Sequence, residues 1–394
     1  MSRARPLGRP GRLWLVVGAC VLVALVGLGI ANLPVAPNAR PGYSTPDTAA
    51  GPLARRLESI VYSSPEVGWA VLPARPFWRL ARSADGGQTW RDVTPLGAGT
   101  NGGLEVSVLG PQSAILAYRP YEYDRDSAFA LSTDGGGDWT TGILPNGVSP
   151  GPQPMAAPSP KSYFAVLGNG ELVFSADGGA TWTVRELPAP PAGSCRATSV
   201  EFTSPATGWV SGICQGGAGL WETSDGGVSW QSEELPTPGD GSQITVALPQ
   251  PGPAAGWFTE ALSRGRGGSS VVLCDLATGA SWSCRPAEQL PAGRILLDFP
   301  SPEQGLVLDA PEAAGALCLA YETADGGGAW SFLTTPIPAA QATALDLVGG
   351  AVEVLAQGGK HTLLWHSANQ GRTWSKARLR VSSGAPPRVN GQSL

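Results

Sequence analysis

Short runs of alternating apolar and polar residues, separated by turn-forming residues, cover most of the chain. The clearest set lies at 199–236, where SVEFTS, GWVSGIC, GLWETS and WQSEELP follow one another. Each run is six or seven residues long and mixes apolar with polar positions, which is typical of a strand with one buried face. The turn SPAT joins the first pair of runs, and DGG joins the last pair. The pattern therefore predicts a unit of four short antiparallel strands.

An eight-residue motif that ends in tryptophan recurs along the chain. SADGGQTW at 83–90 is followed by six altered copies, of which DLATGASW at 275–282 is the most changed. Successive copies are 43 to 52 residues apart, and their closing tryptophans are Trp90, Trp139, Trp182, Trp230, Trp282, Trp330 and Trp374. A four-stranded unit cannot bury both of its faces alone, so a period of this size predicts units that stack on one another. The chain is predicted to be all-β: a seven-bladed β-propeller of four-stranded antiparallel blades, preceded by one N-terminal transmembrane helix.

The first 32 residues carry a different pattern. Residues 1–12 contain four arginines and no acid, and 13–31 read LWLVVGACVLVALVGLGIA, without a charge. About 20 apolar residues can span a bilayer as a helix, whereas the apolar part of a secretory signal is usually about 7–15 residues. We therefore expect a cytoplasmic basic segment at 1–12 and a membrane anchor at 13–32, with the rest of the chain outside the cytoplasmic membrane. Signal cleavage followed by secretion is the alternative, because Gly29-Ile30-Ala31 offers small residues near a cleavage position.

Two further segments lie outside the repeats. Residues 33–56 are rich in Pro and Ala and show no apolar periodicity, which is typical of a semi-stiff linker. Residues 382–394 are predicted to be a disordered tail. These bounds leave 57–381 for the propeller.

The aspartate of the recurring motif is predicted to have a structural role. Its side chain can accept hydrogen bonds from the backbone N–H groups that follow, and the next two glycines permit the positive φ of a tight hairpin. The aspartate stands alone in its turn, without the clustered oxygen ligands that Ca²⁺ prefers, so no metal is expected there. The fifth copy has Ala277 at this position. The other copies have Asp85, Asp134, Asp177, Asp225, Asp325 and Asn369.

The motif resembles the Asp-box, also called the bacterial neuraminidase repeat. A second signature, SPxxGW, occurs at 64–69 and at 204–209, with weaker copies at 252–257 and 301–306. Together the two signatures resemble the propellers related to the photosystem II assembly and stability factor, a family that also occurs in non-photosynthetic bacteria. The resemblance covers 57–381 and implies a propeller that assists assembly, without implying a photosynthetic role.

Four cysteines are spaced symmetrically about predicted turns. Cys195 and Cys214 flank the SPAT turn, and Cys274 and Cys284 flank the fifth copy of the motif, which is the most changed one. Each pair is predicted to face across two antiparallel strands and to form a disulfide, which fits an oxidising exterior. Buried thiols are the alternative. Cys318 has no predicted disulfide partner.

Charge and histidine content exclude two classes of partner. The net charge is −5, and it is −9 without the four arginines of residues 1–12. An acidic domain lacks the basic surface that nucleic acid requires, so no nucleic acid is expected. His361 and His366 are the only histidines, and no Cys-x-x-Cys occurs. Neither a metal site nor a cofactor is expected.

A glycosidase is the enzymatic alternative. Sialidases of the Asp-box class carry an Arg-Ile-Pro segment, an arginine triad and a Tyr nucleophile paired with Glu, and this sequence has no Arg-Ile-Pro. A mechanism with paired carboxylates needs two acids on either side of one sugar bond. Glu201, Glu260 and Asp298 are candidates that the sequence alone does not place. We therefore predict no catalytic residues.

The loops that join second to third strands are the candidate binding surface. In a propeller these loops lie at the opposite end of the blades from the motif turns. The first, second and fifth repeats have Tyr and Arg there, which are enriched at interface hot spots. The candidate residues are Arg75, Arg119, Tyr121, Tyr123, Arg125, Arg264 and Arg266. We predict a non-catalytic scaffold that binds a protein partner in the membrane or envelope; the alternatives are an exo-glycosidase of sialidase type and a glycan-binding module without hydrolysis.

Overall fold

The computed structural model describes residues 59–391 apart from several loops. The loops outside the description are 75–76, 99–103, 119–126, 146–153, 190–192, 234–242, 248–256, 265–267, 276–282, 287–293 and 384–386, with positions 203, 216, 302, 312 and 360. For the described residues between 243 and 295, and for 77, 217 and 218, only the backbone is described. The expected basic segment, apolar segment and linker at 1–56 lie outside the described residues. In the part of the chain that is described, no helix is long and apolar enough to cross a membrane.

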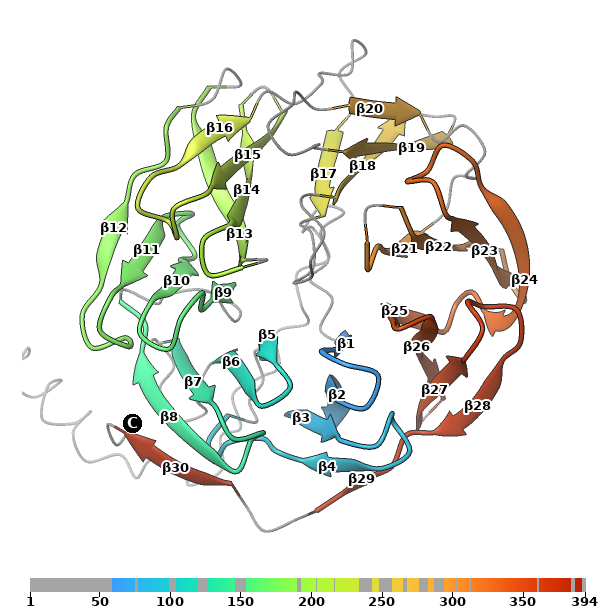
Figure 1. Cartoon of the computed structure of the whole chain (residues 1–394), viewed down its shortest axis with the longest axis horizontal. Helices are drawn as coiled ribbons and strands as arrows, with labels where there is room; N and C mark the ends of the chain where they lie inside the picture. Colours follow the sequence, from blue (N-terminus) through green and yellow to red (C-terminus); the bar gives the residue numbers. More distant parts are fainter. Residues whose placement is uncertain are drawn as a thin grey trace, which may run out of the picture. The chain divides into compact units, whose positions relative to one another are not determined.

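The described strands form seven sheets, which we number 1–7 in chain order (Figure 1). Sheet 1 contains β1 (Ser59–Tyr62), β2 (Gly68–Ala74), β3 (Phe77–Ser83) and β4 (Trp90–Asp92). Sheet 2 contains β5 (Leu104–Gly110), β6 (Ser113–Tyr118), β7 (Ala128–Ser132) and β8 (Asp138–Ile143). Sheet 3 contains β9 (Met155–Ala156), β10 (Tyr163–Val166), β11 (Leu172–Ser175) and β12 (Thr183–Arg185). Sheet 4 contains β13 (Cys195–Phe202), β14 (Gly208–Cys214), β15 (Gly217–Thr223) and β16 (Gln231–Glu233).

The remaining sheets repeat this order. Sheet 5 contains β17 (Gln243–Ala247), β18 (Trp257–Arg264), β19 (Gly268–Asp275) and β20 (Ser283–Pro286). Sheet 6 contains β21 (Arg294–Asp298), β22 (Gly305–Ala310), β23 (Leu317–Thr323) and β24 (Ser331–Pro338). Sheet 7 contains β25 (Ala342–Val348), β26 (Ala351–Gly358), β27 (His361–Ser367) and β28 (Ser375–Arg378). The prediction of an all-β chain with four-stranded antiparallel sheets is confirmed.

The apolar core consists of layers between successive sheets. Alternate residues of a strand point to opposite faces, so Trp69 and Val71 of β2 pack on sheet 2 while Ala70 and Leu72 pack on sheet 7. Other layers join sheets 2 and 3, sheets 3 and 4, and sheets 6 and 7. Because sheet 7 packs on sheet 1, the last repeat contacts the first.

The C-terminal segment differs from the expected disordered tail. β29 (Val381–Ser382) pairs in parallel with β4, and β30 (Arg388–Gly391) pairs in parallel with β8. Each forms a fifth strand on the outer edge of its sheet, so the chain passes from sheet 7 across sheets 1 and 2 (Figure 1). The sequence of this segment is short and polar, and its backbone N–H and C=O groups find partners only because two sheet edges lie beside it.

Candidate functional site

The turn between the third and fourth strands is filled by its own hydrogen bonds. In sheet 1 the Ser83 hydroxyl donates to Asp85 Oδ1 (2.8 Å) and accepts the Gly87 N–H (2.8 Å). Asp85 Oδ1 also accepts the Thr89 N–H (2.9 Å). The Trp90 indole N–H donates to the Gly87 carbonyl (3.0 Å). The side chains of Ser83, Asp85 and Trp90 therefore all have a structural function in the turn.

The hydrogen bonds around the aspartate recur in the other described copies of the motif. In each, the acid or amide accepts both the hydroxyl of the Ser or Thr two positions earlier and the backbone N–H four positions later: Asp134, Asp177, Asp225, Asp325 and Asn369. Hydrogen bonds from Thr181 and Ser229 hold the pKa of Asp177 and of Asp225 at about 2. Their carboxylates are engaged within the turns.

The second glycine of the motif has two reasons to be glycine. Gly179 and Gly227 have φ of +89° and +82°, a region that side chains rarely adopt. A Cβ at either position would also overlap an aromatic ring of the preceding sheet, Phe129 or Phe164. The turn is therefore packed against its neighbour as well as bonded within itself.

The strand ends that flank the predicted binding residues lie at the other end of the sheets. The loops that carry them join β2 to β3, β6 to β7 and β18 to β19, whereas the motif turns join third to fourth strands. Sheets 1 and 2 share a core layer, whereas sheets 3 and 4 separate sheet 2 from sheet 5 along the chain. Arg264 ends β18, and its side chain is not described; the other candidates lie outside the described residues: Arg75, Arg119, Tyr121, Tyr123, Arg125 and Arg266. Their convergence stays a prediction.

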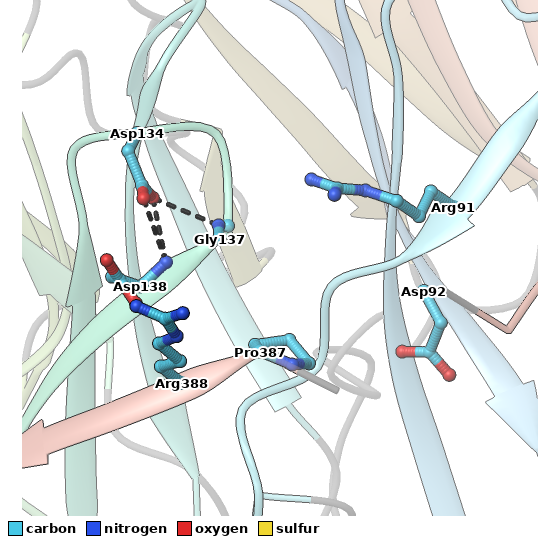
Figure 2. Close-up of a pocket in the computed structure, with 8 residues that line it drawn as sticks. Arg91, Asp92, Asp134, Gly137, Asp138, Pro387 and Arg388 are labelled. Carbon is cyan, nitrogen blue, oxygen red and sulfur yellow. Dashed lines mark hydrogen bonds between the residues drawn. The ribbon is translucent and has the colours of Figure 1, made fainter. Parts of the chain in front are cut away.

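A pocket of 270 Å³ lies where the C-terminal segment crosses sheets 1 and 2 (Figure 2). The Arg388 N–H donates to the Gly137 carbonyl (2.9 Å). The lining is strongly charged and consists of Arg91, Asp92, Asp134, Gly136, Gly137, Asp138, Pro387 and Arg388. The sequence gives no sign of this pocket, because nothing in the motif pattern places residues 387–391 beside sheet 2.

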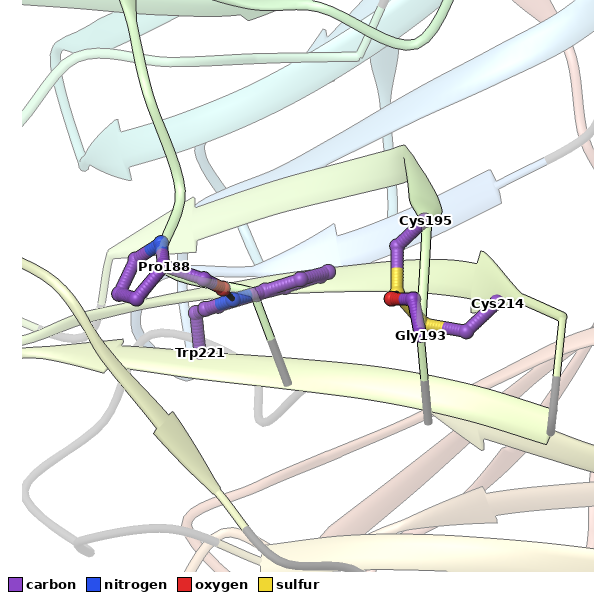
Figure 3. The surroundings of a disulfide bond; sticks show 5 residues. All are labelled: Pro188, Gly193, Cys195, Cys214 and Trp221. Atoms are coloured by element: carbon purple, nitrogen blue, oxygen red, sulfur yellow. Dashed lines mark hydrogen bonds between the residues drawn. A yellow bond between two sulfur atoms is a disulfide. The ribbon is translucent and has the colours of Figure 1, made fainter. Parts of the chain in front are cut away.

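The disulfide predicted between Cys195 and Cys214 is confirmed. The two cysteines are direct cross-strand partners on β13 and β14 (Figure 3). Cys274 and Cys284 are direct backbone partners on β19 and β20, but their side chains are not described, so their disulfide stays a prediction. Cys318 is buried in the layer between sheets 6 and 7.

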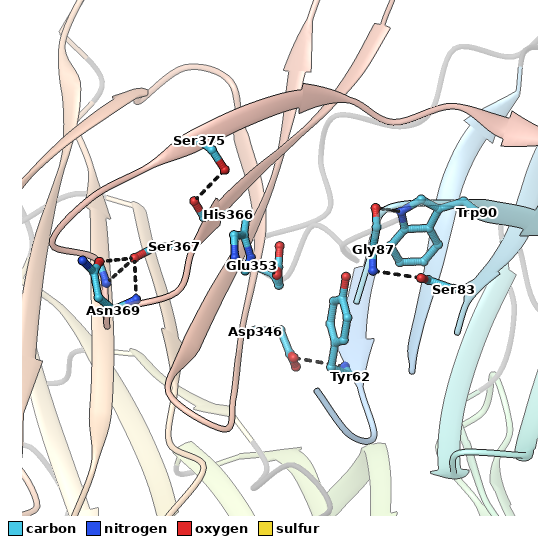
Figure 4. Close-up of polar contacts among 11 residues, drawn as sticks. Tyr62, Ser83, Gly87, Trp90, Asp346, Glu353, His366, Ser367, Asn369 and Ser375 are labelled. Atoms are coloured by element: carbon cyan, nitrogen blue, oxygen red, sulfur yellow. Dashed lines mark hydrogen bonds and ion pairs between the residues drawn. The ribbon is translucent and has the colours of Figure 1, made fainter. Parts of the chain in front are cut away.

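Two buried aspartates link the innermost strands of sheets 6, 7 and 1 to one another by hydrogen bonds. Asp298, the last residue of β21, accepts the Leu347 N–H of β25 (2.6 Å). Asp346 of β25 accepts the Tyr62 N–H of β1 (3.0 Å), as Figure 4 shows. Asp298 pairs with Leu306 and Asp346 pairs with Glu353, so the two aspartates occupy equivalent register positions. Each therefore links its own sheet to the next through a backbone donor.

A third buried carboxylate lies beside the same junction. Glu353 Oε1 lies 2.5 Å from His366 Nδ1, across from it on the neighbouring strand (Figure 4). The glutamate side chain is 3% exposed and the histidine side chain 41%. The histidine therefore connects a buried acid to the solvent side of the sheet.

Burial raises the pKa of all three carboxyls. It raises the pKa of Asp298 to about 6 and that of Glu353 to about 7, the latter against the opposing effect of its hydrogen bond with His366. The pKa of Asp346 lies well above its ordinary value, first because of burial and second because of the charge of Asp298. These groups bind protons more strongly in the folded chain than in the unfolded chain.

The acids considered for glycoside hydrolysis have different surroundings. Asp298 is 7% exposed and bonded within the junction. Glu201 of β13 has its pKa raised to about 8, first by burial and second by the charge of Glu105. The side chain of Glu260 is not described. Among the described residues no group of three or more His, Cys, Asp or Glu side chains is placed to hold a metal ion.

No protein-family model matches the sequence, and no curated protein matches it. Solved structures do match. A structure described as "YCF48 bound to D1 peptide" aligns with a TM-score of 0.52 and 18% identity, covering 78% of this chain and 91% of that one. The fold is a β-propeller.

Two enzymes share this propeller fold over part of their length. The GH74 enzyme of Niastella koreensis aligns with a TM-score of 0.54 and 15% identity, covering 80% of this chain and 53% of the enzyme. A prolyl endopeptidase aligns with a TM-score of 0.55 and 12% identity, covering 94% of this chain and 56% of that one. This chain therefore spans about half the length of either enzyme, and at these identities the likeness concerns the fold alone.

Proposed function

We propose that the chain is a non-catalytic propeller scaffold that binds a segment of a protein partner outside the cytoplasmic membrane. The propeller has seven blades, and residues 13–32 anchor it in the membrane. The partner belongs to a membrane or envelope complex whose assembly the propeller assists. A cleaved N-terminal segment and a secreted propeller are the alternative for location.

The difference between the two ends of the sheets carries this proposal. At the motif end, the turns are closed by their own hydrogen bonds and packed on the preceding sheet. At the opposite end lie the strand ends of the adjacent sheets 1 and 2 between which the sequence carries arginines and tyrosines, which are suited to binding a peptide. These are Arg75, Arg119, Tyr121, Tyr123 and Arg125. The structure described as YCF48 with a D1 peptide supports the proposal as a propeller of similar fold that holds a peptide.

A glycoside hydrolase is the second candidate, and one observation favours it. Glu201 lies on an innermost strand with a pKa raised to about 8, so it is protonated at neutral pH, as the general acid of a glycosidase must be. The GH74 enzyme shares the fold. A glycan-binding surface without hydrolysis is the third candidate.

The test of the scaffold uses photo-cross-linking in intact cells with the full chain. We expect the wild type to form an adduct with a membrane or envelope protein. Replacing Arg75, Arg119 and Arg125 by Gln should reduce the adduct at least about 30-fold, because interface hot spots contribute about 2 kcal/mol or more each. The control replaces by Gln two exposed arginines at another place, Arg378 at the end of β28 and Arg380 just after it, and should leave the adduct unchanged.

Three outcomes would contradict parts of this proposal. An adduct that survives the triple substitution would remove the loop end as the binding surface. Release of sugar from sialosides or xyloglucan by the purified chain, abolished by Glu201→Gln, would establish the hydrolase. Retention on arrayed glycans without turnover would establish the glycan-binding module instead.

A further inference from the structure

Sheet 7 differs from other sheets at one buried position of its second strand. The residue in question is the backbone partner of the residue that directly precedes the recurring motif. It is Trp69 in sheet 1, Trp209 in sheet 4 and Leu306 in sheet 6, each at most 1% exposed. In sheet 7 it is Glu353, which is 2% exposed. A buried acid costs stability where the other repeats bury an apolar side chain, and such a departure from a local rule points to a function.

Glu353 is the middle member of a row of three titratable residues that crosses sheet 7. Its backbone partners are Asp346 on the innermost strand and His366 on the third strand. Side chains directly opposite each other on neighbouring strands lie within contact of one another. Asp346 is buried, whereas the His366 side chain is 41% exposed (Figure 4). The row therefore leads from solvent to the junction of sheets 7 and 1, where Asp346 accepts the Tyr62 N–H.

The surroundings of Glu353 compensate its ionised form poorly. Oε1 lies 2.5 Å from His366 Nδ1, whereas Oε2 is buried and makes no hydrogen bond within the part of the chain that is described. The charge of Glu353 is the second cause, after burial, of the raised pKa of the Tyr62 hydroxyl. The titratable groups that face this place from the neighbouring strands and turns are His366, Asp346, Asp298, Tyr62 and Asp85. A proton lost from Glu353 therefore adds a buried negative charge beside other acids of the junction.

The outer side of the same junction is held by different contacts. β29 pairs with β4, and the Ser382 hydroxyl donates to the Trp90 carbonyl (3.1 Å). Leu379 and Val381 pack on the apolar layer between sheets 7 and 1. None of these contacts involves a carboxyl group. Loosening of the innermost strands therefore leaves the two sheets joined at their outer edge.

We propose that the row of Asp346, Glu353 and His366 is a pH-sensitive latch between the last and the first repeat. While Glu353 carries a proton, β25 holds β1. When Glu353 loses its proton, the inner side of the junction opens locally, and β29 keeps the outer side closed. The latch lies apart from the Tyr and Arg loops, and it neither requires nor supplies a binding partner, so it goes beyond the proposed function.

The test is hydrogen exchange of the full chain at pH 6 and pH 8, resolved to single amides and corrected for the intrinsic exchange rate. The Tyr62 N–H reports the latch. The matched control is the Ala197 N–H, which donates to the Gly170 carbonyl (3.0 Å) and joins sheet 4 to sheet 3 without an acid. We expect the protection of Tyr62 to fall about tenfold more than that of Ala197, as a carboxyl with a pKa of about 7 in the closed state requires.

Two variants assign the effect to the row. Glu353→Gln keeps a hydrogen-bonding side chain but has no proton to lose, so the excess fall at Tyr62 should be at least about threefold smaller than in the wild type. His366→Phe removes the hydrogen bond that opposes the raised pKa of Glu353, so the loss of protection should move to higher pH.

Equal falls at Tyr62 and Ala197 in the wild type would overturn the latch, because they would show that the whole chain, and not the junction, responds to pH. An excess fall that persists undiminished in Glu353→Gln would overturn it as well. If Glu353→Gln does not fold, Glu353→Leu takes its place, since sheet 6 has Leu306 at the equivalent position. A transition that stays at the same pH in His366→Phe would remove His366 from the latch.

Discussion

The motif aspartates accept hydrogen bonds within exposed turns, whereas Asp298, Asp346 and Glu353 lie buried between or beside sheets. In the turns, bonds from neighbouring residues lower the pKa of Asp177 and Asp225. At the junction of sheets 6, 7 and 1, burial raises the pKa instead. A turn bond joins residues four apart, and the Tyr62–Asp346 bond joins residues 284 apart. The first kind of acid stabilises one hairpin, and the second kind holds the last repeat against the first.

The largest expected effect is at Asp346. Asp346→Ala leaves the buried Tyr62 N–H without its acceptor, and a buried unsatisfied donor costs about 1–3 kcal/mol, to which a cavity adds. We expect the free energy of unfolding to fall by about 3 kcal/mol, measured by urea titration of the purified chain.

Asp346→Asn is the matched control, because the amide oxygen can still accept the N–H while the charge is lost. It should cost less than half as much as Asp346→Ala at pH 7. If Asp346→Ala lies within about 1 kcal/mol of the wild type, the junction does not hold the first and last repeats together.

The second prediction concerns pH. A raised carboxyl pKa means that the folded chain binds more protons than the unfolded chain between about pH 4 and 7, so stability falls as pH rises through this window. We expect Asp298 and Glu353 each to lower the stability by about 2–3 kcal/mol between pH 4 and pH 7, because the pKa of each is raised by about two units and each unit corresponds to about 1.4 kcal/mol. The motif aspartates have the opposite sign, because their stabilisation is lost as pH falls from about 4 toward 2. Stability should therefore be highest near pH 4–5, measured by thermal unfolding in a series of buffers.

Asp298→Asn separates the two sets of acids. It removes one buried titrating group and should flatten the decline above pH 4 while leaving the acid limb below pH 4 unchanged. A decline of the same steepness in Asp298→Asn would show that the buried junction is not its source.

Much of the fold could be predicted from the sequence because the strands and turns of each repeat are determined by residues close together in the chain. Alternating residues set the strands, and each bond that closes the Ser/Thr-x-Asp-Gly-Gly turn joins residues at most four positions apart. A short stretch of sequence therefore shows both. The Cys195–Cys214 pair could be predicted for the same reason, since one hairpin brings the two residues opposite each other. The C-terminal strands could not, because β29 and β30 take their structure from edges about 250 to 290 residues earlier.

The candidate site also contains features that the local sequence shows and features that depend on distant residues. The sequence singled out Tyr and Arg loops by residue type, and the described strand ends on either side of these loops lie at one end of the sheets. It named Asp298 only as an acid that it could not place, and it singled out neither Asp346 nor Glu353. A lone acid in an apolar run has no partner visible nearby in the sequence. The signal that could have found Asp298 and Asp346 is their shared position near the end of the first strand of successive repeats.

The smallest expected effect is at a motif turn, where the chain already contains its own control. Asn369 replaces the aspartate in the seventh copy, yet its Oδ1 accepts the Thr373 N–H (2.8 Å) as the carboxylates do. Asp225→Ala removes the acceptor for Ser229 and should lower the free energy of unfolding by about 1 kcal/mol, as loss of a capping side chain does. Asp225→Asn should cost only a few tenths of that, because the oxygen that Asn369 uses is kept. Urea titrations of both variants at pH 7 decide the matter: if Asn costs as much as Ala, the turn depends on charge rather than on the acceptor geometry that the two kinds of copy share.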